Sequence, residues 1–136
     1  MNLFGLLQAR AEDNNPIRIG LIGAGKFGTM FLSQSLKTPG LHIMAIADLD
    51  PEGTKKNLTE TGWPPEKFTA ISLDQARKKG TTYITDDSNI ILSTDEIDVI
   101  IEATGQPDVG VRHALTAIER GTHVVMVNVE ADALCG

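Results

Sequence analysis

The first pattern with chemical meaning is a G-x-G-x-x-G motif near the start of the sequence, Gly23-Ala24-Gly25-Lys26-Phe27-Gly28. Its first glycine would permit a tight turn, and its second would let the backbone approach a pyrophosphate closely. Its third glycine would let a helix pack directly on a strand. Such a loop holds phosphate groups on the unpaired backbone amides at the N-terminus of the helix it opens, aided by the helix dipole.

The context of the motif is what makes it specific, because three turn glycines without a ligand are the simpler alternative. A short β-branched run, Ile17 to Ile22, precedes it, and helical periodicity begins at Lys26. Asp48 closes the next apolar run about 20 residues after the last glycine. A carboxylate at that strand end can accept hydrogen bonds from an adenosine ribose. Together these features predict a dinucleotide site, with Asp50 the better choice for a helix cap.

The residues after Asp48 bear on which dinucleotide is bound. Leu49 and Asp50 follow, and no arginine stands there to receive a 2′-phosphate. Such a phosphate would be repelled by the carboxylate by about 1 kcal/mol per close contact, even in a high dielectric. NAD is therefore favoured over NADP. NADP stays open as the alternative, because Lys55 and Lys56 lie within reach on the following segment.

A second loop, Glu102-Ala103-Thr104-Gly105, ends the apolar run that begins at Val99. In a doubly wound sheet, ligands bind in the crevice beyond the carboxyl ends of the strands. We therefore expect Ala103, Thr104 and Gly105 to lie beside the cofactor, towards its nicotinamide. An ordinary strand-to-helix loop is the alternative.

The elements that must position these loops alternate along the chain. A leading helix in residues 1–15 is expected to bury Leu3, Leu6 and Leu7. Residues 16–136 follow as one domain, with apolar strands expected at 17–22, 42–47, 81–85, 99–103 and 123–127. Helical segments separate them, the clearest carrying an apolar stripe of Val111, Ala114, Leu115 and Ile118. This alternation predicts an α/β fold: a Rossmann-type, doubly wound, mainly parallel sheet with helices on both faces.

Composition excludes several classes of protein. Acidic residues outnumber basic ones by 18 to 12 in 136 residues, so a nucleic-acid partner is not expected. No apolar run reaches the ~18–20 residues of a membrane span, and the N-terminus lacks the pattern of a secretory signal. The one cysteine, Cys135, has no internal partner, which fits a reducing compartment. We expect a cytoplasmic protein that binds no membrane.

The remaining polar groups give weaker signals. An acidic cluster, comprising Asp86, Asp87, Asp95, Glu96 and Asp98, is better explained by helix caps and solvated loops than by a metal site. The histidines, at 42, 113 and 123, lack the spacing of metal ligands, so no metal is predicted. His113 lies off the apolar stripe of its helix, and a surface position is expected for it.

The motifs together resemble the N-terminal domain of homoserine-dehydrogenase-like oxidoreductases. The resemblance rests on residues 17–28, Asp48, residues 98–105 and residues 123–132. It is greatest to the branch with a C-terminal SAF domain, which includes enzymes similar to 1-deoxy-D-xylulose 5-phosphate reductoisomerase and sugar-acid oxidoisomerases. It implies hydride transfer between a nicotinamide cofactor and a small hydroxy or carbonyl compound of the sugar-acid, sugar-phosphate or homoserine kind, with or without isomerisation.

The same resemblance limits what is expected of the chain alone. Relatives carry a lysine after the fifth strand, where this sequence has Asn128, Glu130 and Asp132 as its only catalytic candidates. Relatives also continue into a substrate-binding region, so the 136-residue chain is expected to be inactive by itself. Two alternatives stay open: an NAD(H)-sensing module that acts through a partner, and an S-adenosylmethionine-dependent methyltransferase, whose loop usually reads G-x-G-x-G. A homo-oligomer is also left open.

Overall fold

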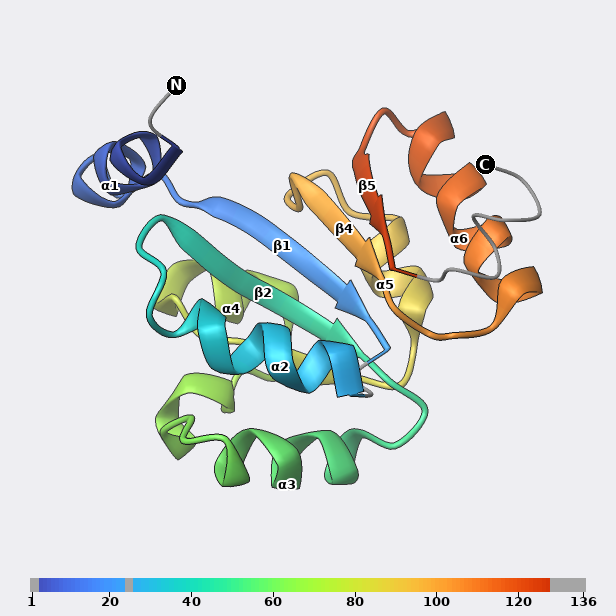
Figure 1. Ribbon diagram of the computed structural model, residues 1–136, viewed down its shortest axis with the longest axis horizontal. Helices are drawn as coiled ribbons and strands as arrows, with labels where there is room; N and C mark the ends of the chain where they lie inside the picture. The colour runs from blue at the N-terminus through green and yellow to red at the C-terminus, as the bar shows by residue number, and fades with distance from the viewer. Residues whose placement is uncertain (1–2, 24–25, 128–136) are drawn as a thin grey trace.

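A computed structural model describes residues 3–23 and 26–127 of the chain. Figure 1 shows a twisted sheet with helices packed around it. The strands are β1 (Ile17–Ile22), β2 (Leu41–Ala47), β3 (Tyr83–Thr85), β4 (Val99–Glu102) and β5 (His123–Met126). The α-helices are α1 (Leu3–Glu12), α2 (Lys26–Ser35), α3 (Pro51–Glu60), α4 (Leu73–Lys79), α5 (Ser88–Leu92) and α6 (Pro107–Glu119), with a 3-10 turn at Pro65–Phe68.

The strands form one parallel sheet in the order β3-β2-β1-β4-β5. The chain therefore runs outward from β1 to β3 on one side and then crosses back to β4 on the other. This reversal makes a crevice between the carboxyl ends of β1 and β4, which is where a doubly wound sheet binds its ligand. The predicted Rossmann-type fold is confirmed, and the first strand has the expected bounds.

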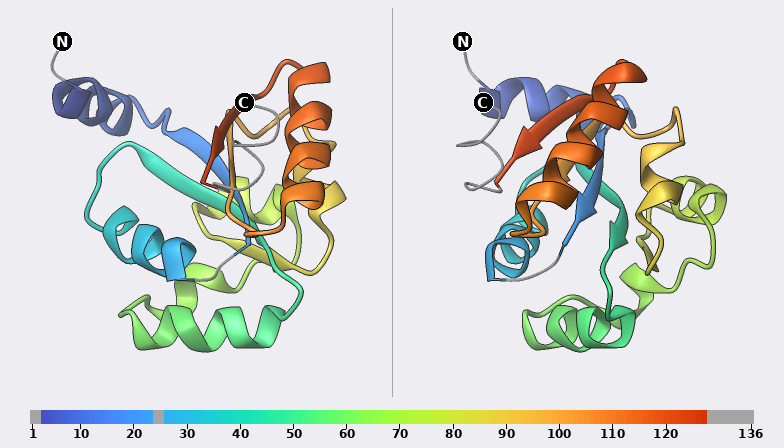
Figure 2. Two further views of the ribbon diagram at one scale, coloured as in Figure 1. Left: turned by 45° about the vertical axis from the view of Figure 1, so that its right-hand side comes forward. Right: turned by 90° about the vertical axis from the view of Figure 1, so that its right-hand side faces the viewer.

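The helices cover both faces of the sheet, as the two views in Figure 2 show. Leu32 of α2 and Leu58 of α3 pack with Leu21 and Ile46 in one hydrophobic cluster. Helices α4, α5 and α6 contribute residues to a second cluster, which contains Ile22, Met44 and Ile100. Burial of both faces explains why the strands read as nearly continuous apolar runs.

Local signals set the ends of two helices, and the cap at Asp50 is the one that the sequence predicts. The Asp50 side chain accepts a hydrogen bond from the Gly53 amide and caps α3, while Ser72 accepts one from Gln75 and caps α4. Gly80 ends α4 in the left-handed conformation, with φ of +66°. These caps fix where α3 begins, and α3 follows directly on the loop that carries Asp48.

Two predictions about buried faces are wrong. On α6, Leu115 and Ile118 are 57% and 64% exposed, whereas Ala114 and Ala117 are buried. The helix turns its small residues to the sheet, and Ala117 belongs to the cluster that contains Ile100. On α1, Leu7 is buried as expected but Leu6 is exposed, and the side chain of Leu3 lies outside the described part of the chain.

Candidate functional site: a crevice at the carboxyl ends of the strands

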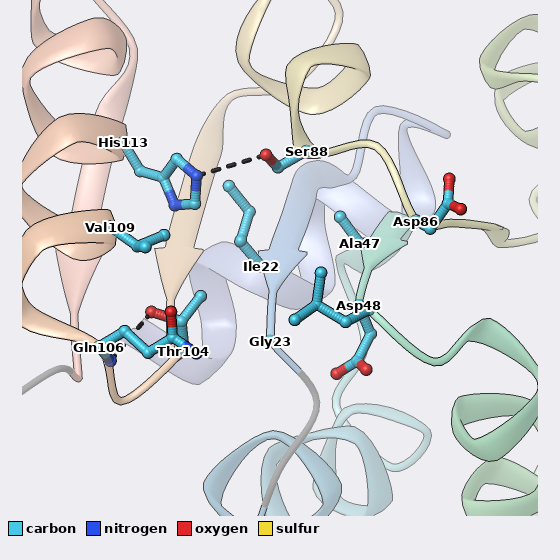
Figure 3. A pocket seen from close by; sticks show the side chains of 11 residues that line it. Ile22, Gly23, Ala47, Asp48, Asp86, Ser88, Thr104, Gln106, Val109 and His113 are labelled. Atoms are coloured by element: carbon cyan, nitrogen blue, oxygen red, sulfur yellow. Dashed lines mark hydrogen bonds between the residues drawn. The ribbon is translucent and has the colours of Figure 1, made fainter.

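A cavity of about 230 Å³ opens at the carboxyl ends of β1, β2 and β4. Figure 3 shows its two sides, with Val109 and His113 projecting from α6 and Asp48 and Asp86 lying opposite, beyond Ile22 and Gly23. Its walls are mainly apolar with a few polar groups, as is usual for a small-molecule site. The lining residues are Ile22, Gly23, Ala47, Asp48, Leu49, Asp86, Ser88, Thr104, Gln106, Val109 and His113.

Gly23 has the conformation and the crowding that the glycine motif predicts for its first position. Its φ is +89°, in the region that favours glycine. A Cβ atom there would lie 2.7 Å from the Ala103 carbonyl oxygen and 2.8 Å from the Thr104 nitrogen. The loop after β1 therefore passes directly against the loop after β4, and only glycine permits this contact.

Only some of the other residues of the glycine motif belong to the described part of the chain. Ala24 and Gly25 lie outside the described residues, and Lys26 and Phe27 form the first turn of α2. Gly28 is buried within that helix, as close packing of helix on sheet requires. Helix α2 therefore begins immediately after the loop that leaves Gly23, with its positive dipole end at the crevice.

Asp48 lies just beyond β2 in the lining of the cavity. Its backbone amide donates to the Thr85 carbonyl at 3.0 Å, which ties this loop to β3. Its Oδ1 accepts a hydrogen bond from the Asp50 amide at 2.9 Å, so the carboxylate has a fixed orientation. Lys55, one of the two lysines that would favour NADP, forms an exposed ion pair with Glu52 at 3.3 Å.

The loop after β4 is held by a buried carboxylate. Glu102 is the last residue of β4 and its side chain is fully buried. Its Oε1 accepts hydrogen bonds from the Thr104 amide at 2.9 Å and from the Thr104 hydroxyl at 2.5 Å. The Thr104 hydroxyl also accepts one from the Gln106 amide at 3.3 Å. Thr104 lines the cavity as expected, Ala103 precedes it, and exposed Gly105 has a φ of +72°.

His113 is not on the surface, contrary to the expectation from sequence. Its side chain is only 13% exposed, and its Nδ1 lies 2.5 Å from Glu102 Oε2. Its Nε2 lies 3.3 Å from the Ser88 hydroxyl at the start of α5. The buried face of α6 follows Gly110, Ala114 and Ala117, and His113 belongs to this face. That row of small residues is the signal in the sequence that would have placed His113 on the buried face of α6.

Hydrogen bonds decide the charge state of Glu102. Burial raises the pKa of the carboxyl, but the bonds from His113 and from the Thr104 hydroxyl and amide outweigh it and lower the pKa below its usual value. Glu102 is therefore a carboxylate at neutral pH. It accepts bonds from three donors, and its charge is compensated within the protein.

Most of the acidic cluster is accounted for by a helix cap, a backbone contact and ion pairs. Asp87 caps α5, the Asp98 carboxylate accepts from the Arg18 amide, and Asp95 and Glu96 form ion pairs with Arg120 and Arg77. Within the described residues, no group of three or more His, Cys, Asp or Glu side chains is arranged to hold a metal ion. The catalytic candidates Asn128, Glu130 and Asp132 lie outside the described residues. No helix in the described part of the chain is both long and apolar enough to cross a membrane.

Comparison with known proteins agrees with this geometry. Residues 17–126 match the GFO/IDH/MocA family, described as an oxidoreductase family with an NAD-binding Rossmann fold. The match extends from the start of β1 to the end of β5, and the chain belongs to this family. NAD is the dinucleotide of the family. The match favours an oxidoreductase over a methyltransferase, and it does not support the homoserine-dehydrogenase-like branch with a SAF domain.

Individual relatives share the same domain. A protein of Saccharopolyspora erythraea named as a glycosyl hydrolase family 109 protein is 28% identical over 117 residues, 83% of this chain and 22% of that protein. The myo-inositol dehydrogenase of Corynebacterium glutamicum has a TM-score of 0.59 at 22% identity, over 82% of this chain and 27% of that one. The Lactobacillus casei myo-inositol dehydrogenase, solved with NAD(H) and myo-inositol, has a TM-score of 0.58 at 16% identity, over 82% and 28%. The chain thus spans about a quarter of the length of these relatives.

Proposed function

We propose that this chain is the NAD(H)-binding part of an oxidoreductase that moves a hydride between the nicotinamide and a polyol or sugar-like compound. The observation that carries the proposal is the cavity at the carboxyl ends of the strands, with Gly23 on one side and the Asp48 carboxylate on another. Bound nicotinamide supplies the hydride chemistry, and the protein supplies binding and orientation.

The residues fit one nucleoside end of a dinucleotide by size and by chemistry. A cavity of about 230 Å³ is smaller than the ~300–1,000 Å³ typical of a drug-sized ligand, so it suits one nucleoside end of the cofactor. Asp48 would accept hydrogen bonds from the ribose hydroxyls, while Ile22, Leu49 and Val109 would contact the base. The pyrophosphate would lie beyond Gly23 at the first turn of α2. The cofactor-binding set is thus Gly23 to Gly28, Asp48 and the Ala103–Gly105 loop.

The substrate class is inferred from the relatives. The structural neighbours include two dehydrogenases named for myo-inositol, and the resemblance seen in the sequence is to enzymes of sugar acids, sugar phosphates and homoserine. A polyhydroxylated compound is common to most of these. The homoserine-dehydrogenase-like branch, and with it an isomerisation step, is a narrower form of the proposal. It rests on residues 102–105 and 127–132 of the sequence alone.

Calorimetric titration of the purified chain with NADH, NADPH and S-adenosylmethionine tests the proposal. We expect saturable binding of NADH, weaker binding of NADPH and none of S-adenosylmethionine. Binding of S-adenosylmethionine without NADH would overturn the proposed function.

The chain by itself is expected to bind the cofactor without turning over a substrate. Catalysis requires the reacting groups to be held in near-attack geometry, and the cavity of the described residues suits a nucleoside rather than a nucleoside and a substrate together. Steady-state assays with inositols, sugar acids and homoserine, each with NAD, should show no activity. Sustained turnover by the 136-residue chain would contradict this expectation.

A further inference from the structure

The contacts of Glu102 join three parts of the crevice that are far apart in the sequence. One carboxylate oxygen accepts hydrogen bonds from the amide and the hydroxyl of Thr104. The other carboxylate oxygen contacts Nδ1 of His113 on α6. His113 in turn contacts Ser88 at the start of α5. Thr104, His113 and Ser88 all line the cavity.

A buried carboxylate is a costly way to stabilise a sheet. Its neighbours in β4, Ile100 and Ile101, are apolar and buried. Replacing both partners of a buried hydrogen bond by apolar groups of the same shape can be nearly neutral, whereas removing one partner leaves a buried polar group unsatisfied at a large cost. The pair is therefore better explained by what it fixes in place than by a contribution to folding.

What the pair fixes is the shape of the loop after β4. Both donors of Thr104, its amide and its hydroxyl, are directed to Glu102. This loop is also the surface against which Gly23 packs, so any shift in it moves the wall of the predicted phosphate site. A loop held in its bound conformation beforehand gives higher affinity, because less ordering is required on binding.

We propose that Glu102 and His113 are positioning residues for the dinucleotide: together they lock the β4–α6 loop and tie it to α5, so that the crevice is formed before the cofactor arrives. The inference rests on the proposed function and assigns two residues that the glycine motif does not include. Glu102 acts through Thr104, and His113 acts through Glu102 and Ser88. The pair thus determines affinity without belonging to the glycine motif or to the Asp48 loop.

A double-mutant cycle on NADH affinity tests the proposal, measured by calorimetry on folded protein. His113→Leu should weaken NADH binding at least tenfold, because it removes the group on α6 that contacts Oε2 of the buried Glu102 carboxylate. His113→Asn, which keeps a donor near the position of Nδ1, should stay within about threefold of wild type. Arg112→Leu, at an exposed neighbouring position of the same helix, is the matched control and should leave affinity unchanged.

The second arm of the cycle separates positioning from general stability. In a Glu102→Gln background the charge is gone, so adding His113→Leu should weaken binding by much less than tenfold. A merely structural role would lower the thermal midpoint and leave the affinity of the folded protein unchanged. If His113→Leu fails to fold, Ser88→Ala replaces it, with an expected loss of about threefold.

The outcomes distinguish a failure of the proposed function from a failure of the positioning role. Wild-type chain that binds no NADH overturns the proposed function and this inference with it. Wild-type chain that binds NADH, with folded His113→Leu or Ser88→Ala within experimental error of wild type, overturns the positioning role alone. Equal losses in His113→Leu and His113→Asn would also contradict it.

Discussion

Two partly buried histidines lie at opposite ends of the same sheet and have opposite surroundings. His113 meets the carboxyl end of β4, where a buried carboxylate and a serine hydroxyl contact its ring. His42 lies at the amino end of β2, where its Nε2 is 2.7 Å from the Thr81 carbonyl oxygen. Burial lowers the pKa of His42; the Thr81 carbonyl opposes this shift, and the nearby cations Arg18 and Lys67 add to it.

The contrast shows that the two ends of the sheet have different tasks. At the amino end a neutral histidine satisfies one backbone carbonyl, which is a structural role. At the carboxyl end a histidine completes a network that reaches two loops of the cavity. The same residue type therefore contributes to folding at one end and, in our proposal, to ligand binding at the other.

The largest difference between the two ends of the sheet should appear in the free energy of unfolding, when glycines of positive φ are replaced by alanine. Gly23→Ala should destabilise the protein by about 2–5 kcal/mol, because a left-handed φ is added to overpacking against the Ala103 backbone. Gly80→Ala at the amino end has open space around it and should cost only about 1–2 kcal/mol. Urea unfolding of both variants makes the comparison. Equal losses would show that the contact between the two crevice loops is unimportant.

The next effect concerns cofactor choice at the carboxyl end. Asp48→Ala should weaken NAD binding about tenfold, or 1.4 kcal/mol, through loss of the ribose contacts. NADP binding should be unchanged or improved, since a repulsive carboxylate is removed. Asp74→Ala, at an exposed position of α4, serves as control and should change neither affinity. Equal weakening of both cofactors by Asp48→Ala would mean that this residue does not discriminate between them.

A smaller effect is expected in the acid stability of the protein. Because the pKa of Glu102 is lower in the folded chain than its usual 4.5, its contribution to stability is complete above that pH. It is lost as the pH falls through the lower, folded value. The wild-type chain should therefore lose stability below about pH 4.5, and Glu102→Gln should lose less over the same range. Parallel curves of unfolding free energy against pH would contradict the assigned shift.

The smallest effect belongs to His42. Its pKa is lower in the folded state than the usual 6.5, so folding favours the neutral ring. Its contribution to stability is complete above pH 6.5 and declines as the pH falls towards the folded value. His42→Gln keeps a donor for the Thr81 carbonyl and should flatten the stability curve just below pH 6.5. NADH affinity should not change in His42→Gln. A change in affinity would contradict the different roles assigned to the two ends of the sheet.

Sequence patterns predicted most of the fold and the outline of the site. The apolar runs predicted the strands, and Asp50, expected to cap a helix, does cap α3. Gly23, Asp48 and Thr104 meet in one cavity, as their positions at strand ends imply. The fold could be predicted because its elements depend on local chemistry and on the general geometry of a doubly wound sheet, whereas cofactor binding by the cavity stays a prediction.

The features that the sequence did not reveal depend on long-range packing. The buried face of α6 is set by the sheet beneath it, so a large-residue stripe at Leu115 and Ile118 gave the wrong face. His113 and Glu102 are eleven positions apart, and nothing local indicates that they touch. The contact between Ser88 and His113 joins residues 25 positions apart and exists only because α5 and α6 lie side by side.

The central claim is that the cofactor binds at the carboxyl end, beside His113 and away from His42. NMR titration of the isotope-labelled chain with NAD tests it directly, because backbone amides and imidazole groups at both ends are observed in one experiment. We predict saturable shifts at Gly23, Asp48, Thr104 and the His113 ring, with His42 and Thr81 unchanged. Saturable shifts at His42 and Thr81, with the crevice residues unaffected, would contradict the account.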